Sequence, residues 1–303
     1  MKTFHSSELL LAPPKPIQYI VDGLIPLGMG GDTSGMPDSG KSTILLSMAA
    51  AISTGAPFGG LKTAQTPCAW ISGEASGGDV LQRDLHRLKV GGESDILFML
   101  PNDVLFRWVD DKWTTTEEGC AVIQQLRELQ IGFVVIDTIG SLCAGMQEVN
   151  NDQQRQLARH LRDEFAGLSY HTISHTNQAS AKDELSWRLH YLSRAGGNGF
   201  PGSQRLAAGV SRLCVGRQGN AATETNEGDA FGISKTDVIN KKLVAFGISK
   251  NNEAPPAVWT HQHPAVFEIR RDGGLVLVKD GRECAPIVFN EGMRDERPAI
   301  SSC

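Results

Sequence analysis

The sequence lacks the cysteine pattern of a zinc protein or a disulfide-stabilised protein. Its six cysteines are scattered and no two form a C-x-x-C pair, which argues against a zinc site and against a disulfide framework. Long apolar runs are also missing, because stretches such as 43–52 are far shorter than the ~20 residues of a membrane-spanning helix. The N-terminus has no signal-peptide layout. We therefore expect a cytoplasmic protein with no membrane partner.

An excess of basic charge is missing too. Across 303 residues, 34 acidic side chains outnumber 29 basic ones and give a net charge of −5. Such a chain cannot coat nucleic acid by bulk charge, so any DNA contact must come from a few local basic loops. What is present is the composition of an ordinary globular protein, with 40% hydrophobic and 21% charged residues.

Short apolar runs alternate with helical segments from Ile17 onward, which predicts a parallel sheet covered by helices. Helices are expected at about 41–53, 78–89, 117–130, 151–166 and 203–209. Strands are expected at about 67–73, 96–100, 132–137, 170–174, 211–217, 241–249, 265–270 and 274–278. Asp272-Gly273-Gly274 predicts a hairpin between the last two. We expect an N-terminal arm over 1–16, one domain over 17–284 and a flexible tail over 285–303, with loops at 176–202 and 218–237.

A phosphate-binding pattern occupies residues 35–42. Gly35-Met36-Pro37-Asp38-Ser39-Gly40-Lys41-Ser42 matches G-x-x-x-x-G-K-[ST] in full, and Thr43 continues into the predicted helix. Such a loop points backbone N–H groups at a nucleotide's β-phosphate, and the helix adds its positive N-terminal end. Lys41 is expected to reach the β- and γ-phosphates and Ser42 to hold Mg²⁺. The strand before the loop is weak in β-branched residues, so a glycine-rich turn that caps a plain helix is the alternative.

Two acidic residues that follow predicted strands complete the expected site. Asp137 ends the apolar run 133–136, where it would hold a Mg²⁺-bound water. Thr138 follows it instead of a glutamate, so the carboxylate that orients the attacking water must come from another strand. Glu74, after strand 67–73, is the candidate. The alternatives are a buried strand that happens to end in aspartate and a glutamate that only serves the next helix N-terminus.

His175 follows the predicted strand 170–174, near the edge of the sheet where the γ-phosphate is expected. An imidazole there is suited to sense that phosphate and to pass the signal to the following loop. A hydrogen-bonded surface histidine is the alternative.

These residues, in this order, resemble the RecA-fold AAA-type ATPases, and in particular the RepA-like hexameric replicative helicases of plasmids, over about residues 17–279. Besides the P-loop, the matching pieces are 71–74, 81–88, 135–138, 174–175, 202–203 and 245–252. The resemblance implies an α/β, RecA-like P-loop NTPase fold with a twisted, mostly parallel central sheet flanked by helices. The chain departs from this family in the weak strand before the P-loop and in the polar strand 170–174. From these departures we expect a weakly active or marginally stable member.

The resemblance also implies a ring of six subunits with ATP bound between neighbours. Lys250 and Arg212, or Arg217 in place of Arg212, would reach the γ-phosphate held by the next subunit. The loops 140–153 and 176–200 would face a central channel that holds single-stranded DNA. The second loop carries three basic residues, Lys182, Arg188 and Arg194. Solvated strand charges and a merely solvated loop are the alternatives.

Two functions follow from these expectations. The first is a motor that hydrolyses ATP with Mg²⁺ and moves along or unwinds DNA in the replication of a plasmid or other mobile element. Its catalytic residues would be Glu74, His175, Arg212 and Lys250. The second is an ATP-gated oligomeric DNA-binding or regulatory protein without unwinding activity. No DNA-reading module such as a helix-turn-helix is evident in the sequence, which weighs mildly against the second function.

Overall fold

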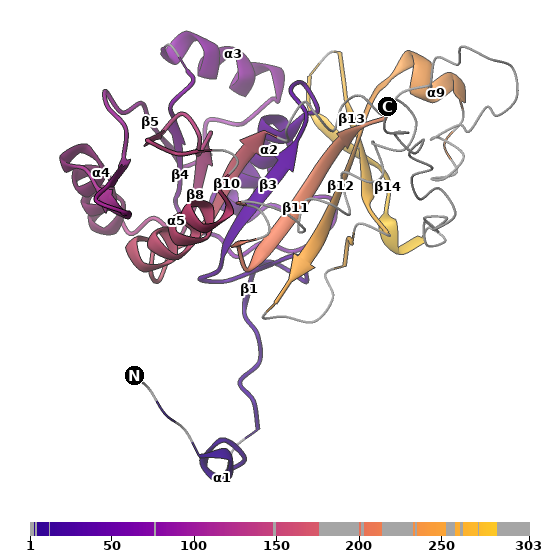
Figure 1. Ribbon diagram of the computed structural model, residues 1–303. Coiled ribbons are helices and arrows are strands. Elements are labelled where there is room, and N and C mark those ends of the chain that lie inside the picture. Colours follow the sequence, from indigo (N-terminus) through magenta and orange to yellow (C-terminus); the bar gives the residue numbers. More distant parts are fainter. Residues whose placement is uncertain are drawn as a thin grey trace, which may run out of the picture.

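A nine-stranded sheet forms the centre of the protein (Figure 1). The computed structural model describes residues 3, 5–11, 13–75, 77–147, 150–175, 200, 203–213, 233, 235–252, 258–260, 263–271 and 273–283. The strand order is β14-β13-β12-β11-β3-β10-β8-β4-β5. The parallel strands are β3 (Gly30–Gly35), β4 (Cys68–Ser72), β5 (Ile96–Met99), β8 (Phe133–Asp137), β10 (Ser169–His175) and β11 (Leu206–Arg212). The antiparallel strands are β12 (Lys242–Asn251), β13 (Ala265–Ile269) and β14 (Leu275–Lys279).

Helices cover both faces of the sheet, because successive side chains of a strand point to opposite faces. On one face, α2 (Lys41–Thr54) buries its apolar side chains in a cluster that includes Phe133 and Val135. On the other face, α4 (Glu117–Glu128) and α5 (Asn151–Glu164) pack in a second cluster with Val134 and Ile136. The predicted α/β class, with a mostly parallel sheet flanked by helices, is confirmed at this level.

The helix starts follow from local capping residues. Thr116 precedes α4, and its hydroxyl accepts a hydrogen bond from the Gly119 N–H at 3.0 Å. Asn150 precedes α5 in the same way, and its Oδ1 accepts from the N–H groups of Asp152 and Gln153, each at 3.1 Å. Side-chain acceptors of this kind satisfy donors that have no partner inside the helix. The expected helices at 41–53, 78–89, 117–130 and 151–166 are present, the second as α3 (Gly78–Arg87).

The helix expected at 203–209 is wrong. Residues 206–212 form the strand β11, which pairs with β3 on one side and β12 on the other. Leu206, Ala207, Ala208 and Val210 are buried within the sheet. Alanine favours helices, but the backbone here pairs with a strand on each side, and this tertiary environment overrides local propensity. The strand expected at 211–217 therefore begins earlier, at Leu206.

Several short strands were not predicted. β6 (Phe106–Val109) and β7 (Lys112–Thr115) form a hairpin, and β9 (Cys143–Ala144) pairs with β6. The hairpin turns at Asp110 and Asp111, both at positive φ, a less common sequence for such a turn than Asn-Gly. The segment expected as the loop 140–153 contains β9 and the start of α5 instead. A further pair, β1 (Tyr19–Val21) and β2 (Ile25–Pro26), packs its apolar residues against the α2 face.

The weak strand before the P-loop and the polar strand after α5 lie side by side. Asp32 and Thr172 are register partners, and the Thr172 hydroxyl donates to Asp32 Oδ1 at 2.7 Å. Ser174 Oγ donates to Asp32 Oδ2, also at 2.7 Å. On the opposite face, the His171 ring lies 3.2 Å from Thr33 Oγ1. The two departures from the family pattern are therefore a single feature, in which Thr172 and Ser174 of one strand satisfy Asp32 of the other. Ser34 Oγ and His171 Nε2 remain without a hydrogen-bond partner among the described residues.

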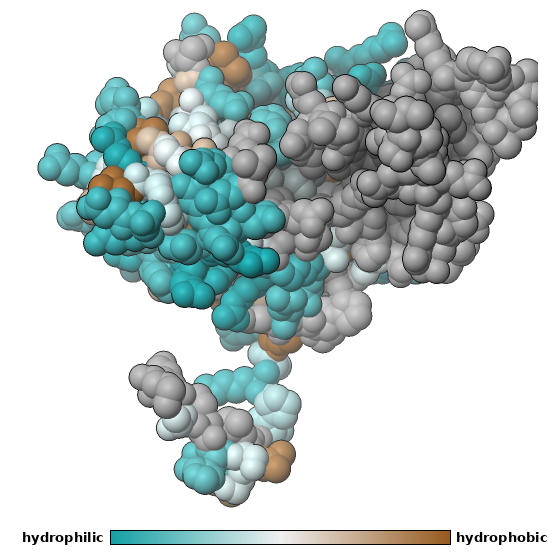
Figure 2. All heavy atoms as spheres, viewed as in Figure 1, coloured by the Kyte–Doolittle hydropathy of each residue, from teal (hydrophilic) through white to brown (hydrophobic). Residues whose placement is uncertain are grey.

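The N-terminal segment extends away from the sheet and carries the short helix α1 (Ser6–Leu9) at its far end (Figure 1). Leu10 and Leu11, next to this helix, are 83% and 85% exposed. Elsewhere on the described surface, hydrophobic residues are scattered among hydrophilic ones on the face drawn in Figure 2. Within the described residues, no helix is long and apolar enough to cross a bilayer.

The last described elements complete the C-terminal part of the sheet. The predicted hairpin at 272–274 joins β13 and β14, which pair in antiparallel fashion. The described chain also contains α9 (Lys235–Asn240) and a short 3-10 helix at Gly281–Glu283. The predicted tail 285–303 and most of the predicted loops 176–202 and 218–237 lie outside the described residues.

The contact between Gly30 and Tyr170 generates a prediction on stability. A Cβ at Gly30 would overlap the ring of Tyr170, which is 1% exposed and cannot move aside. We expect Gly30→Ala to destabilise the protein by about 1–3 kcal/mol, the usual cost of overpacking. Gly78→Ala is the matched control, because nothing lies within 4 Å of a Cβ there and the residue begins a helix. Urea denaturation followed by fluorescence measures both; equal midpoints for the two variants would contradict the expectation.

Candidate nucleotide-binding site

The predicted site residues from three strands meet at one edge of the sheet. Parallel strands end at the same edge, and the register pairs Gly35 with His175, Ile173 with Asp137, and Asp137 with Ser72. The P-loop follows β3 at this edge, and Glu74 follows β4. Carboxyl ends of parallel strands are where ligands bind in open α/β sheets. The structure therefore brings together the P-loop, Glu74, Asp137 and the end of β10.

The P-loop wraps closely between β3 and α2. Gly40 has φ 97°, a left-handed conformation that favours glycine, and Lys41 begins α2 directly after it. A Cβ at Gly35 would overlap the backbone oxygen of Val210, so only glycine fits there. Ser39 Oγ is buried and has no hydrogen-bond partner within the described part of the chain. A buried hydroxyl without a partner is unfavourable, and a phosphate oxygen is a partner that this loop can accommodate.

Lys41 is buried in the loop with only 5% exposure. Its Nζ donates to the carbonyl oxygens of Gly35 at 3.0 Å and Met36 at 2.8 Å, and it lies 3.5 Å from His175 Nδ1. Burial lowers the pKa of Lys41 to about 8, and the nearby carboxylate of Asp137 is the largest influence in the opposite direction. A phosphate at this position would give the ammonium a fully charged partner.

Ser42 and Asp137 form the candidate metal site. Ser42 Oγ donates to Asp137 Oδ2 at 3.2 Å. Burial and then the nearby Glu74 raise the pKa of Asp137 to about 6, which shows that a cation here would relieve an electrostatic cost. Among the described residues, no group of three or more His, Cys, Asp or Glu could hold a metal alone. This donor set fits Mg²⁺, which takes few protein ligands and completes its shell with water and nucleotide phosphates.

Glu74 is held by two neighbours, the predicted His175 and Thr138, to which the sequence assigned no role. Thr138 Oγ1 donates to Glu74 Oε1 at 2.8 Å, and His175 Nε2 lies 3.7 Å from the same oxygen. The backbone N–H groups of Glu74 and Ala75 donate to Ser72 Oγ. The sequence feature that could have indicated a role for Thr138 is its position directly after Asp137. Glu74 is half exposed, so water can reach its carboxylate.

A basic cluster beside the P-loop was also missed. Arg87, at the end of α3, donates from Nη2 to Thr43 Oγ1 at 3.1 Å. Its backbone oxygen accepts from the Gly274 N–H at 2.7 Å, so the β13–β14 hairpin contacts α3. Burial lowers the pKa of Lys242, at the start of β12, and the nearby Arg212 and Arg87 lower it further. The cluster consists of Arg87, Arg212 and Lys242 and adds positive charge to this flank of the site.

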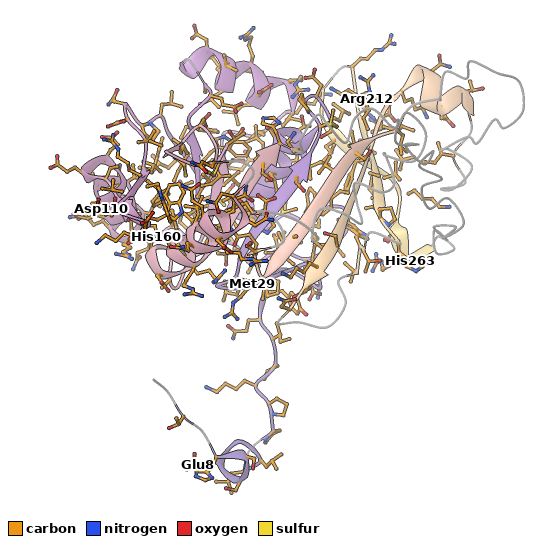
Figure 3. The ribbon with its side chains drawn as sticks, in the orientation of Figure 1. Glu8, Met29, Asp110, His160, Arg212 and His263 are labelled. Atoms are coloured by element: carbon orange, nitrogen blue, oxygen red, sulfur yellow. The ribbon has the colours of Figure 1, made fainter. Side chains whose placement is uncertain are left out.

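The two predicted inter-subunit residues lie at opposite edges of the sheet. Arg212 is exposed at the end of β11, the edge that carries the P-loop, whereas Met29 marks the other edge in Figure 3. Lys250 pairs with Ala207 at the other end of β11, where burial and the nearby Arg162 lower its pKa. Because Arg212 and Lys250 lie at opposite edges, their predicted inter-subunit roles are independent of each other and need separate tests. The other basic residues assigned to inter-subunit or DNA contacts lie outside the described residues: Lys182, Arg188, Arg194 and Arg217.

Comparison with known families identifies the larger group. Residues 2–181 match the family described as AAA domain, and this is more than half of the 303 residues. The chain belongs to the AAA domain family. The matched part of the AAA domain contains the P-loop, Glu74, Asp137 and His175, while Arg212 and Lys250 lie beyond it. No curated protein gives a significant match to the chain. Family membership indicates a nucleotide-binding ATPase domain and supports the general part of the sequence expectations.

The Ser42–Asp137 pair generates a prediction on metal dependence. We expect Asp137→Asn to weaken ATP binding in the presence of Mg²⁺ by about 10- to 100-fold, because the carboxylate that orients the metal shell is lost. Binding measured in EDTA should be unchanged. Titration with a fluorescent ATP analogue, with and without Mg²⁺, measures both affinities. Asp152→Asn, at a carboxylate that is 82% exposed on α5, is the control. A metal-dependent affinity equal to that of the wild type would rule out the assigned role of Asp137.

Proposed function

We propose that the protein is a Mg²⁺-dependent ATPase motor of the RecA-like type that acts on DNA as a ring. The observation that carries the proposal is the convergence of Lys41, the Ser42–Asp137 pair and Glu74 at one edge of the sheet, from separate strands. A phosphate-binding lysine, a metal-binding pair and a carboxylate near them are the parts that nucleotide hydrolysis requires. Membership of the AAA domain family supports the ATPase part of the proposal.

Each side chain has a role that its surroundings suit. Lys41 moves from the carbonyls of Gly35 and Met36 to the β- and γ-phosphate oxygens of bound ATP. Ser42 and Asp137 hold Mg²⁺, which when bound neutralises charge on the phosphates. Glu74 orients the attacking water and accepts its proton. His175, between Lys41 and Glu74, senses the γ-phosphate. Thr138 fixes the carboxylate of Glu74 through its hydrogen bond.

The ring belongs to the proposal as well. Arg212 is exposed at the P-loop edge, where a neighbouring subunit can contact it. A positive charge supplied by the neighbour stabilises the transition state and couples hydrolysis to the subunit contact. Lys250 contacts a neighbour from the other edge of the sheet. A ring of six subunits would place single-stranded DNA in the central channel, in contact with the loop 176–200. Replication of a plasmid or other mobile element is the proposed setting.

A second function is favoured by the hydrogen bond between Thr138 and Glu74. This bond takes up part of the acceptor capacity of the carboxylate that must orient water, and a protein that keeps this bond when ATP is bound would orient water less well and hydrolyse ATP slowly. Such a protein would use ATP to assemble on DNA as a gated regulatory scaffold without unwinding. Stimulation by DNA separates the two functions, because a motor couples hydrolysis to DNA contact and a scaffold need not.

The proposed motor generates a prediction on ATPase activity. We expect single-stranded DNA to stimulate ATP hydrolysis by the wild-type protein and Lys41→Ala to reduce the rate at least about 100-fold, as for loss of a major electrostatic group. Lys62→Ala removes an exposed lysine away from the P-loop and is the control. Phosphate release measures the rates. Full activity of Lys41→Ala would reject the site, and hydrolysis that ignores DNA would favour the scaffold.

The proposed ring generates a prediction on mixed assemblies. We expect Arg212→Ala to bind ATP normally but to hydrolyse it at least about 100-fold more slowly, as for loss of an arginine finger. Mixing it with Lys41→Ala should restore part of the activity, because an intact P-loop then meets an intact Arg212 from the neighbour. Mixing Lys41→Ala with Asp137→Asn is the control, since both defects lie in the same half of the site. No restoration in the first mixture would place Arg212 in its own subunit's site.

A further inference from the structure

The strand that leads into the P-loop contains a carboxylate that the proposed hydrolysis does not use. Asp32 lies in the middle of β3 and is 0% exposed. Burial raises the pKa of Asp32 to about 7, and the hydrogen bonds from Thr172 and Ser174 oppose this shift. A buried ionisable group is costly unless its hydrogen bonds are well made, and an apolar side chain of similar size avoids that cost. We therefore expect Asp32 to have a function besides its place in the strand pairing.

The two hydroxyl groups bound to Asp32 lie at different distances from the nucleotide-binding edge. Thr172 is directly opposite Asp32 in the register, whereas Ser174 lies diagonally ahead, next to His175. His175 is the last residue of β10, and it pairs with Gly35, the last residue of β3. The bond to Ser174 thus ties the last residues of β10 to the strand that carries the P-loop.

Side chains on the opposite face depend on this connection. His175 alternates with Ser174, so its ring points to the other side of the sheet, where it lies 3.5 Å from Lys41 Nζ and 3.7 Å from Glu74 Oε1. The ring is 46% exposed, so solvent covers almost half of it. Its position is therefore set mainly by the backbone that carries it.

We infer that Asp32 is a positioning residue: through Ser174 it holds the carboxyl end of β10 against β3, so that the His175 ring stays between Lys41 and Glu74. The consequence for turnover rests on the proposed ATPase function, but the consequence for the position of the ring does not. Asp32 touches neither the phosphates nor the metal in this arrangement. Its charge also acts on the buried Lys41, so variants at Ser174 and Thr172, which leave that charge in place, isolate the effect through β10.

A matched pair of variants tests the inference. Ser174→Ala and Thr172→Val each remove one hydroxyl that donates to the same carboxylate at 2.7 Å. Thr172 Oγ1 also donates to the Gly31 carbonyl and is fully buried, so Thr172→Val should cost at least as much stability as Ser174→Ala. We expect only Ser174→Ala to loosen the end of β10. Histidine labelled with ¹³C in the ring reports the position of His175 by NMR; the signal is identified among the eight histidines by its loss in His175→Gln. We expect this signal to shift in Ser174→Ala and to stay in place in Thr172→Val.

Steady-state kinetics provide the second measurement. Ser174→Ala should lower kcat roughly three- to tenfold, the range of coupling through a positioning group, with KM for ATP unchanged, and Thr172→Val should leave kcat as it is. Asp32→Asn keeps an acceptor and a donor for the two hydroxyls and should retain most of the turnover, whereas Asp32→Ala should behave like Ser174→Ala. Denaturation midpoints of all four variants show whether each is folded.

The possible results separate the inference from the proposed function. The inference would be overturned if the His175 signal did not move in Ser174→Ala, or if it shifted equally in both variants. Asp32 would then only help to hold β3 and β10 together. A shift confined to Ser174→Ala supports it even when the wild-type protein hydrolyses no ATP, in which case only the proposed function fails. A shift in Ser174→Ala with unchanged kcat in an active protein would also overturn the role in turnover.

Discussion

The parallel register of β3, β10, β8 and β4 is the constraint on which the rest of the structure depends. All of these strands end at one edge of the sheet. Residues that are far apart in the chain therefore meet there because they follow neighbouring strands. Lys41 enters this edge already surrounded by Asp137, Asp32 and Glu74, which offset the cost of burying its ammonium group. The site is thus organised before a ligand arrives, since loop carbonyls and acidic side chains hold the lysine in place.

The C-terminal part of the described chain packs beside this site. The family match ends at residue 181, yet β11 and β12 continue the sheet next to β3, and the β13–β14 hairpin reaches the end of α3. This addition brings Arg212 and Lys242 to the flank of the P-loop, where Arg87 already lies. Burial, and then the repulsion from Arg212 and Arg87, lower the pKa of Lys242 in this basic cluster. An anionic ligand or an acidic surface of a neighbour would offset the repulsion between these positive charges.

Much of the site could be predicted from the sequence, because its signals are local. The P-loop pattern, Asp137 after an apolar strand and Glu74 after another strand are each visible in a few neighbouring residues. The helix expected at 203–209 could not be corrected in this way, since Ala207 and Ala208 form a strand only because β3 and β12 lie on either side. Thr138 and Arg87 were missed for a similar reason. Their importance lies in partners, Glu74 and Thr43, that are distant in the chain.

The pairing of Asp32 with Thr172 and Ser174 constrains how this chain can evolve. A version with apolar residues in both strands would be self-consistent, and so is the polar version seen here. A single step between them is not. Replacing Asp32 alone leaves the Ser174 hydroxyl without its acceptor and the Thr172 hydroxyl with the Gly31 carbonyl alone, and replacing the hydroxyls alone leaves a carboxylate in an apolar setting. Descendants of this protein should therefore exchange these three positions together, and ancestral sequences that mix the two versions should be rare.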